Sequence, residues 1–243
     1  MAYDPKAVKA VMDSLTKYGV TNPFVQKGVL GTIAKESKFV PKSESGYGGT
    51  SNARIRTIFG KRVADLSEDQ LTIIKADPVK FFNKVYGGWM GNMGAGDGYR
   101  YRGRGFNQLT GKDNYNFYSK RIGRDLVANP DLVNDPEVAA EVSAAFFDTA
   151  FKNKTLLNKI GVSNINDVKD IQTGVRAAVQ ANAGAGTSLE TEFMKENLRR
   201  ALDAVSEFGE DVLETIKRRP GTTIAIILSI SLLITGIVMF SQK

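Results

Sequence analysis

The sequence predicts a mainly α-helical domain, followed by a long amphipathic helix and a C-terminal transmembrane helix. Three observations lead to this fold class. Apolar residues recur at helical spacing through most of the first 180 residues, a glycine-rich segment interrupts that pattern, and an uncharged apolar run lies near the end of the chain. We therefore expect a domain over residues 1–186, a helical stalk over 187–219 and a membrane-spanning helix over 220–241.

The expected helices begin at recognisable capping signals. Asp4-Pro5 and Asn22-Pro23 each place a capping side chain before a proline at the first helical position, which predicts a helical hairpin at the start of the chain. Residues 87–111 contain nine glycines and no long apolar period, which predicts a long functional loop. Further helices are expected near residues 52–63, after Asp77-Pro78, and over 115–122, 136–151 and 165–180.

The C-terminal part of the chain carries two more signals. Thr187 and Glu190 form a capping-box pattern before an amphipathic stripe, which is typical of a packing helix or coiled-coil stalk, with a membrane-surface helix as the alternative. Residues 222–240 carry no charge and, at about 1.5 Å per residue, approach the roughly 30 Å of a bilayer core. The basic residues at 217–219 would then keep the large domain on the cytoplasmic side.

The composition limits the chemistry that the chain can perform. The sequence has no Cys and no His, which excludes Ser-His-Asp and Cys-His triads, thiolate nucleophiles and His- or Cys-ligated zinc. Asp and Glu are then the strongest candidates for proton transfer. The formal net charge of +7 favours anionic partners, but the basic residues form no recognisable nucleic-acid-binding motif, so we expect no nucleic acid.

Two glutamates are candidates for such proton transfer. Glu36 follows an apolar helical stretch, and Glu44 lies eight residues later in the turn-rich segment KSESGYGG. Two carboxylates on different local elements can acquire different environments, so that one serves as a protonated acid and the other as an ionised base. Spacing alone leaves open that both lie on a solvated face.

The segment Tyr86–Tyr115, YGGWMGNMGAGDGYRYRGRGFNQLTGKDNY, contains GDG, YRGRG, QLTG and NY in that order. This pattern resembles glycoside hydrolase family 19, which comprises chitinases and related phage and bacterial endolysins. The resemblance extends upstream to AKES and FGKR and downstream to LVANPDLVNDPEVAAEVSAAFF and QANAGAG, and so covers about residues 25–186. It implies a mainly helical, lysozyme-like α+β fold with a small β-hairpin lobe beside a cleft.

The resemblance also implies catalytic roles. Glu36 matches the family's general acid, with Lys35 in place of the usual His, and Glu44 matches the general base that precedes Tyr47, at a spacing about one residue shorter than usual. Thr110 matches the hydroxyl residue that holds the attacking water. The implied reaction is inverting hydrolysis between two carboxylates, without metal or organic cofactor.

The remaining candidates would contact substrate, each with a structural alternative. Gln108 lines the sugar cleft or stabilises its loop, Tyr99 and Tyr101 stack on sugars or pack in the core, and Arg104 contacts carboxylates or braces the loop. Arg102 is a further candidate, which would contact carboxylates of the bacterial cell wall. Two asparagines match polar residues of the family's cleft, Asn114 in the NY pair and Asn182 in Asn-Ala-Gly.

Together these features predict a peptidoglycan hydrolase of a phage, associated with the virion and acting on the host wall. Its expected partners are glycan strands, other virion proteins and, through residues 222–240, a lipid bilayer. We expect a single-pass protein of the host inner membrane or of a lipid-containing virion. A chitinase, a lytic transglycosylase and a catalytically weak wall-binding virion protein are the alternatives.

Overall fold

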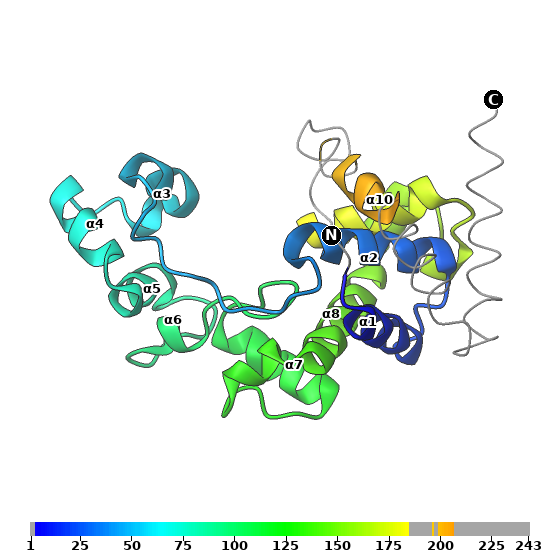
Figure 1. Cartoon of the computed structure of the whole chain (residues 1–243), viewed down its shortest axis with the longest axis horizontal. Helices are drawn as coiled ribbons and strands as arrows, with labels where there is room; N and C mark the ends of the chain where they lie inside the picture. Colours follow the sequence, from blue (N-terminus) through cyan, green and yellow to red (C-terminus); the bar gives the residue numbers. More distant parts are fainter. Residues whose placement is uncertain (1–2, 185–195, 197–198, 207–243) are drawn as a thin grey trace. The chain divides into compact units, whose positions relative to one another are not determined.

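A computed structural model describes residues 3–184, 196 and 199–206 of the 243-residue chain (Figure 1). These residues form two compact units, one from the described residues up to Phe39 together with those from Phe146 onward, and the other from Val40–Ala145. The boundary falls inside one helix. The helices are α1 (Pro5–Lys17), α2 (Pro23–Ser37), α3 (Asn52–Phe59), α4 (Glu68–Lys75), α5 (Pro78–Tyr86), α6 (Asp97–Arg100), α7 (Lys112–Ile122), α8 (Pro136–Phe151), α9 (Lys154–Ile160) and α10 (Ile171–Ala183), with short 3-10 helices at Gly60–Arg62, Pro130–Asn134 and Ile165–Asp167.

Capping side chains start the helices where the sequence predicted. The Asp4 carboxylate accepts a hydrogen bond from the Lys6 backbone N–H, and the Asn22 side chain accepts from the backbone of Phe24 and Val25. In both helices proline occupies the first turn, where its missing N–H would have no intrahelical partner. The expected helical hairpin is therefore confirmed.

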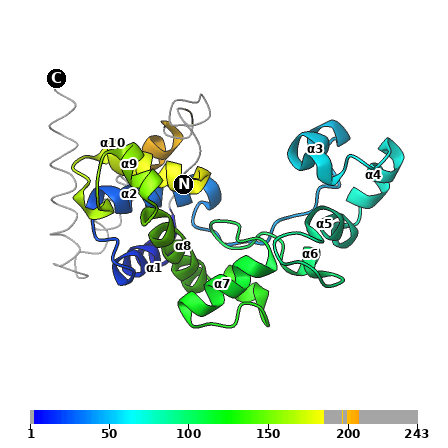
Figure 2. The same ribbon diagram turned by 180° about the vertical axis from the view of Figure 1, so that it is seen from behind.

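In the first unit, a close approach of α2 and α10 forms the centre (Figure 2). A Cβ added at Gly28 would overlap the carbonyl of Gly174 and lie 2.8 Å from the Cα of Val175. A Cβ at Gly174 would overlap the Phe24 carbonyl in turn. Only glycine lets the two backbones approach this closely.

The described residues 199–206 extend this packing. They are helical, and Ala201 and Val205 are buried in one cluster with Val175 and Val179 of α10. The described part of the expected stalk therefore packs on the first unit. The boundaries at 186 and 219 stay predictions, because most of residues 187–219 lies outside the described part of the chain.

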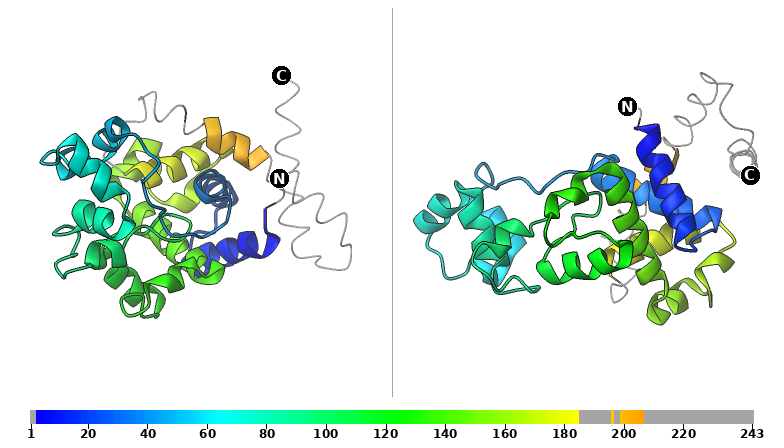
Figure 3. Two further views of the ribbon diagram at one scale, coloured as in Figure 1. Left: turned by 60° about the vertical axis from the view of Figure 1, so that its left-hand side comes forward. Right: turned by 90° about the horizontal axis from the view of Figure 1, so that it is seen from below.

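In the second unit, α5 packs against α4 and α6 around an aromatic centre (cyan to green in Figure 3). Phe81, Phe82 and Val85 of α5 are fully buried with Ile55, Val63 and Leu71. The rings of Phe82 and Tyr86 stack with centroids 5.8 Å apart. This centre fixes the end of α5, from which the glycine-rich loop begins.

The expected β-hairpin lobe is wrong for the residues that the structure describes. They contain a single isolated antiparallel bridge between Arg104 and Leu109, with N–H to carbonyl distances of 3.1 and 2.8 Å. Gly105 and Gln108 have φ values of +75° and +52° just inside the bridge. Because this left-handed backbone turns sharply within the pair, the ladder does not extend into strands.

The expected membrane anchor is not supported either, and we correct the membrane-bound localisation accordingly. Within the described ranges, no helix is both long and apolar enough to cross a bilayer. The longest, α8, has 16 residues and so spans about 24 Å, less than the roughly 30 Å of a hydrocarbon core. Residues 220–241, including the expected bilayer contact at 222–240, lie outside the described residues.

The contact between α2 and α10 gives a first prediction. Gly28→Ala should lower the free energy of unfolding by about 1–3 kcal/mol, because the new methyl group forces two packed backbones apart. Urea denaturation of the full chain measures this change. Gly49→Ala is the matched control, since a Cβ there would meet no atom within 4 Å. Equal stability of the two variants would contradict the close approach.

Candidate active site

Backbone hydrogen bonds tie Glu44 to the glycine-rich loop in the second unit. Glu44 lies between α2 and α3, and its N–H donates to the Gly103 carbonyl at 2.7 Å. The Gly103 N–H donates in return to Glu44 Oε2 at 3.3 Å. Gly103 therefore positions both the backbone and the carboxylate of Glu44.

Two tyrosines complete the surroundings of this carboxylate. The Tyr47 hydroxyl donates to Glu44 Oε1 at 2.9 Å. The Tyr86 hydroxyl lies 3.1 Å from Oε1 and 3.0 Å from Oε2, so its proton is shared between them. With Gly103, three donors hold the carboxylate in one orientation, and none of them carries a positive charge.

Both tyrosines keep their protons unusually strongly. Burial raises the pKa of Tyr86 far above its usual value of 10.0, and the adjacent Glu44 charge and hydrogen bond raise it further. The same causes, again with burial first, raise the pKa of Tyr47. Both hydroxyls therefore remain hydrogen-bond donors at any physiological pH.

Thr110 lies close to the Glu44 carboxylate. A Cβ added at Gly103 would lie 2.8 Å from Gln108 Oε1, 3.2 Å from Glu44 Oε2 and 3.3 Å from Thr110 Oγ1. The three oxygens thus border one small space beside Gly103, and any side chain there would be too close to them. The Thr110 hydroxyl donates to the Gln108 carbonyl at 2.9 Å, which leaves its oxygen lone pairs to accept from a third group.

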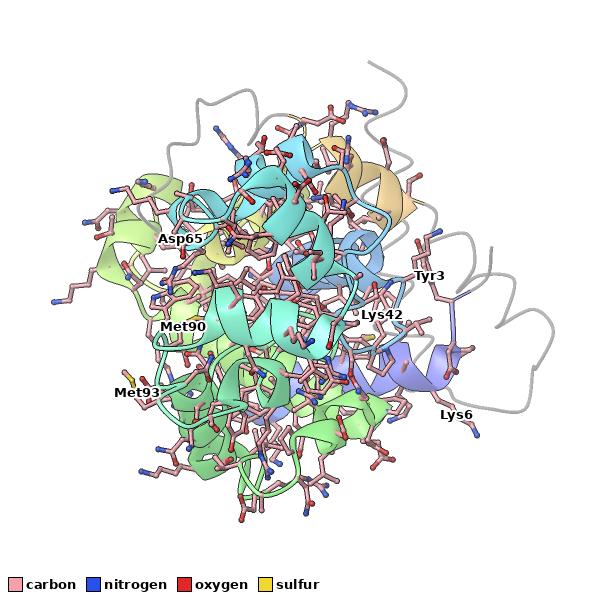
Figure 4. All side chains as sticks on the ribbon, turned by 90° about the vertical axis from the view of Figure 1, so that its left-hand side faces the viewer. Tyr3, Lys6, Lys42, Asp65, Met90 and Met93 are labelled. Carbon is pink, nitrogen blue, oxygen red and sulfur yellow. The ribbon has the colours of Figure 1, made fainter. Side chains whose placement is uncertain are left out.

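Gln108 acts mainly as a brace of the loop. Its Nε2 donates to the Lys42 carbonyl at 3.0 Å and to the Gly105 carbonyl at 3.1 Å (Lys42 is labelled in Figure 4). These bonds tie the segment that carries Glu44 to the glycine-rich loop. Of the two roles considered for Gln108, the structure shows the loop-stabilising one directly.

Arg104 braces the same loop from within. Its guanidinium is buried and donates to the carbonyls of Arg100 and Arg102, to the Tyr115 hydroxyl and to Asp131 Oδ1. Tyr101 is also buried, and its hydroxyl donates to the Val127 carbonyl. Arg104 thus makes contacts that brace the loop, and Tyr101 packs in the core. Both were the structural alternatives to substrate contact.

The other predicted contacts lie apart from this centre or at its edge. Asn114 is exposed and donates to the Thr110 carbonyl at 2.8 Å. Tyr99 packs beside Phe82, and the Arg102 guanidinium lies 4.1 Å above its ring. Asn182 is exposed near the end of α10, in the first unit.

Glu36 belongs to the first unit, in the last turn of α2. Its side chain is 38% exposed, and Oε1 forms an ion pair with Lys35 Nζ at 3.0 Å. The replacement of the expected His by Lys35 therefore gives Glu36 a charged neighbour.

Sequence reasoning missed two residues of the Glu44 site. Tyr86 begins the glycine-rich motif, but no spacing rule linked it to a carboxylate 42 residues earlier. Gly103 was noted only as part of YRGRG, although its missing side chain makes the space between Glu44 and Thr110. In the described part of the chain, no group of three or more acidic side chains is gathered as a metal site.

Comparison with known proteins agrees with the motifs. A family model described as chitinase class I matches residues 82–182, which include Tyr86, Gly103 and Thr110. This stretch is therefore similar to the chitinase class I family over about two fifths of the chain. A glycosyl hydrolase family 19 domain-containing protein of Haemophilus influenzae is 34% identical over 134 residues, half of this chain and 62% of the relative.

Two plant proteins are similar to shorter stretches of the chain. An acidic 27 kDa endochitinase of Solanum lycopersicum is 46% identical over 63 residues, which is 26% of this chain and 24% of the relative. Chitinase 8 of Oryza sativa subsp. japonica is 47% identical over 55 residues, which is 22% of this chain and 21% of the relative. The chain thus spans less than two thirds of each relative.

The raised pKa of Tyr86 gives a second prediction. Its folded-state pKa lies above the unfolded value near 10, so its stabilising contribution is complete below pH 10 and is lost as the pH rises further. Tyr86→Phe should make the alkaline loss of stability shallower, by up to about 1.4 kcal/mol per pH unit. Urea denaturation between pH 9 and 11 tests this; parallel curves for both proteins would contradict it.

Proposed function

We propose that the chain is an inverting glycosidase that hydrolyses the amino-sugar backbone of peptidoglycan. Glu36 would be the general acid, Glu44 the general base, and Thr110 the residue that positions the attacking water. The roles come from the family resemblance. The observation that carries the proposal is the oriented Glu44 carboxylate, which shares a small space beside Gly103 with the Thr110 hydroxyl.

The proposed reaction uses each group once. Protonated Glu36 donates its proton to the glycosidic oxygen as the bond from that oxygen to the anomeric carbon breaks. A water attacks the same carbon from the opposite face, and Glu44 accepts a proton from this water. The products are a new reducing end and a free hydroxyl on the leaving sugar, so no cofactor is consumed.

The surroundings of Glu44 suit a general base in this reaction. Three donors hold the carboxylate, so little reorganisation is needed when the water binds. Because Tyr86 shares one proton between two oxygens, a shift of its hydroxyl toward Oε1 would leave Oε2 with only the long bond to Gly103. Oε2 is also the oxygen nearest to the Gly103 space that Thr110 borders, which makes it the acceptor that we assign.

The choice of substrate rests on the form of the motifs. Their compact order resembles the endolysin branch of the family, which favours peptidoglycan, whereas the two plant relatives are named as chitinases, which favours chitin-like polymers. Both polymers present N-acetylated amino sugars to the same carboxylates. In biological terms, the protein would be part of a phage particle and would open the cell wall of the host.

Substitution of the two glutamates tests the mechanism. Glu36→Gln and Glu44→Gln in the full chain should each lower the rate of peptidoglycan digestion by about 10²–10⁴-fold, because each amide can neither give nor take the required proton. Reducing-end products are measured by mass spectrometry. Glu137→Gln, an exposed change on α8, is the control and should retain the wild-type rate.

Three outcomes would contradict the mechanism in different ways. Activity that survives Glu44→Gln would assign the base elsewhere. Anhydro ends in place of reducing ends would indicate a lytic transglycosylase, which needs no water-activating base. A wild-type chain that binds the wall without cutting it would support the wall-binding alternative.

Thr110 gives a separate test of water positioning. Thr110→Val keeps the shape of the side chain but removes its oxygen, and should lower kcat by about 10–100-fold with little change in KM. Thr110→Ser keeps the hydroxyl and should retain most of the activity. Equal losses in both variants would show that the methyl group, and not the hydroxyl, is what matters.

A further inference from the structure

A second polar cavity lies in the same unit as Glu44. It has a volume of about 570 Å³, and its lining includes Tyr99, Arg100, Arg102, Arg104, Asn129 and Asp131. This volume is in the usual range for small-molecule sites. Three arginines and one carboxylate among the lining residues give the cavity an excess of positive charge, whereas neither Glu44 nor Thr110 lines it.

Arg102 has most of its hydrogen-bonding capacity unused. A guanidinium offers five N–H donors, and Nη1 of Arg102 donates one of them to the Tyr99 carbonyl at 3.0 Å. Among the described residues, the other donors of Arg102 have no acceptor. The Tyr99 ring lies 4.1 Å from the guanidinium carbon, and this cation–π contact holds the group in place while its edge stays open.

Arg100 and Arg104 contribute in different ways. Arg100 is exposed, and its Nη2 donates to the carbonyls of Val127 and Ala128, which leaves Nε and Nη1 without an acceptor in the described residues. Arg104 is buried, and its Nε and Nη1 already donate hydrogen bonds to other residues of the same unit. Its partner Asp131 has a side chain that is 81% exposed, so solvent weakens the charge that would otherwise compete with a bound anion.

The cavity and the candidate active site share one loop, because Arg102 lines the cavity and the next residue binds Glu44. Arg102 precedes Gly103, whose N–H and carbonyl both bind Glu44. Neighbouring Cα atoms are about 3.8 Å apart, so the backbone of Arg102 lies next to the residue that binds Glu44. Because Glu44 and Thr110 do not line the cavity, a group that it binds would be a substituent of a sugar at Glu44 and not that sugar ring itself.

We propose that this cavity, through Arg102 and Arg100, binds a carboxylate carried by a peptide substituent of the glycan strand, and thereby selects peptidoglycan over uncharged chitin. A planar guanidinium with an open edge matches a carboxylate through two parallel hydrogen bonds. The inference rests on the proposed function, because it names the substrate class for the same site.

A pair of small ligands tests the inference without any hydrolysis. N-Acetylmuramyl-L-alanyl-D-isoglutamine carries a free carboxylate, and its methyl ester is the uncharged match. Binding of both to the full chain is measured by NMR titration. The wild-type chain should bind the acid about tenfold more tightly than the ester, a difference that one charge-assisted pair can supply.

Variants assign this preference to the cavity. Arg102→Met should abolish it, and Arg100→Met, at a more exposed position, should reduce it by about threefold. Arg54→Met removes the same charge from the exposed surface of α3 and should preserve it. A thermal melt of each variant separates lost binding from lost folding, and Arg102→Lys, which keeps the charge but not the paired donors, should retain only part of the preference.

The possible results separate this inference from the proposed function. Equal binding of acid and ester, or an equal loss in Arg54→Met and Arg102→Met, overturns the carboxylate site even if the chain digests the wall. A preference that depends on Arg102 in a chain that does not digest the wall supports the site and overturns the glycosidase. Inorganic phosphate that displaces the acid at equal concentration and ionic strength would overturn the carboxylate assignment, since the cavity would then be a general oxyanion site.

Discussion

The buried guanidinium of Arg104 is the constraint on which the rest of the site depends. A charged group that is 3% exposed needs hydrogen-bond partners, and Arg104 finds them through Nη1 in the carbonyls of Arg100 and Arg102 and the Tyr115 hydroxyl. The hydrogen bonds of this one side chain therefore fix the backbone of the loop around Gly103. Because Gly103 in turn binds Glu44, the position of the candidate base follows from a residue that need not touch the substrate.

The chain performs this positioning without histidine or cysteine. Where many hydrolases orient a base with a charged or metal-bound neighbour, here two tyrosine hydroxyls and one backbone N–H hold the Glu44 carboxylate. Burial keeps both tyrosines protonated, so the donors do not change with physiological pH. Because these three donors are uncharged, they place no positive charge beside the base. The arginines that line the cavity remain available for other contacts.

Glycines have distinct physical roles in the two units. Gly28 and Gly174 permit α2, which carries Glu36, to pack backbone against backbone on α10. Gly103 instead keeps open the space that Glu44 and Thr110 border. In the first case the missing side chain lets two backbones pack together, and in the second it lets the side chains of Glu44 and Thr110 approach the loop closely.

The sequence by itself determined the local features. Proline and capping residues predicted where α1, α2 and α5 begin, and the ordered motifs of residues 86–115 predicted the similarity to chitinase class I that the family model finds over residues 82–182. These signals are local, because a cap or a motif is complete within a few residues. The expected membrane helix was also a local inference, but it concerned residues outside the described chain and the structure gives it no support.

Only the tertiary structure decided which side chains meet. Tyr86 and Glu44 are 42 residues apart, and no periodicity links them. The same limit explains the incorrect β-hairpin, since the turn within the Arg104–Leu109 bridge depends on the left-handed backbone of Gly105 and Gln108. It also explains why Gln108 and Arg104 could not be assigned from the motif alone. A polar residue in a loop can bind a ligand or brace the backbone, and which it does depends on the carbonyl groups that folding brings within reach.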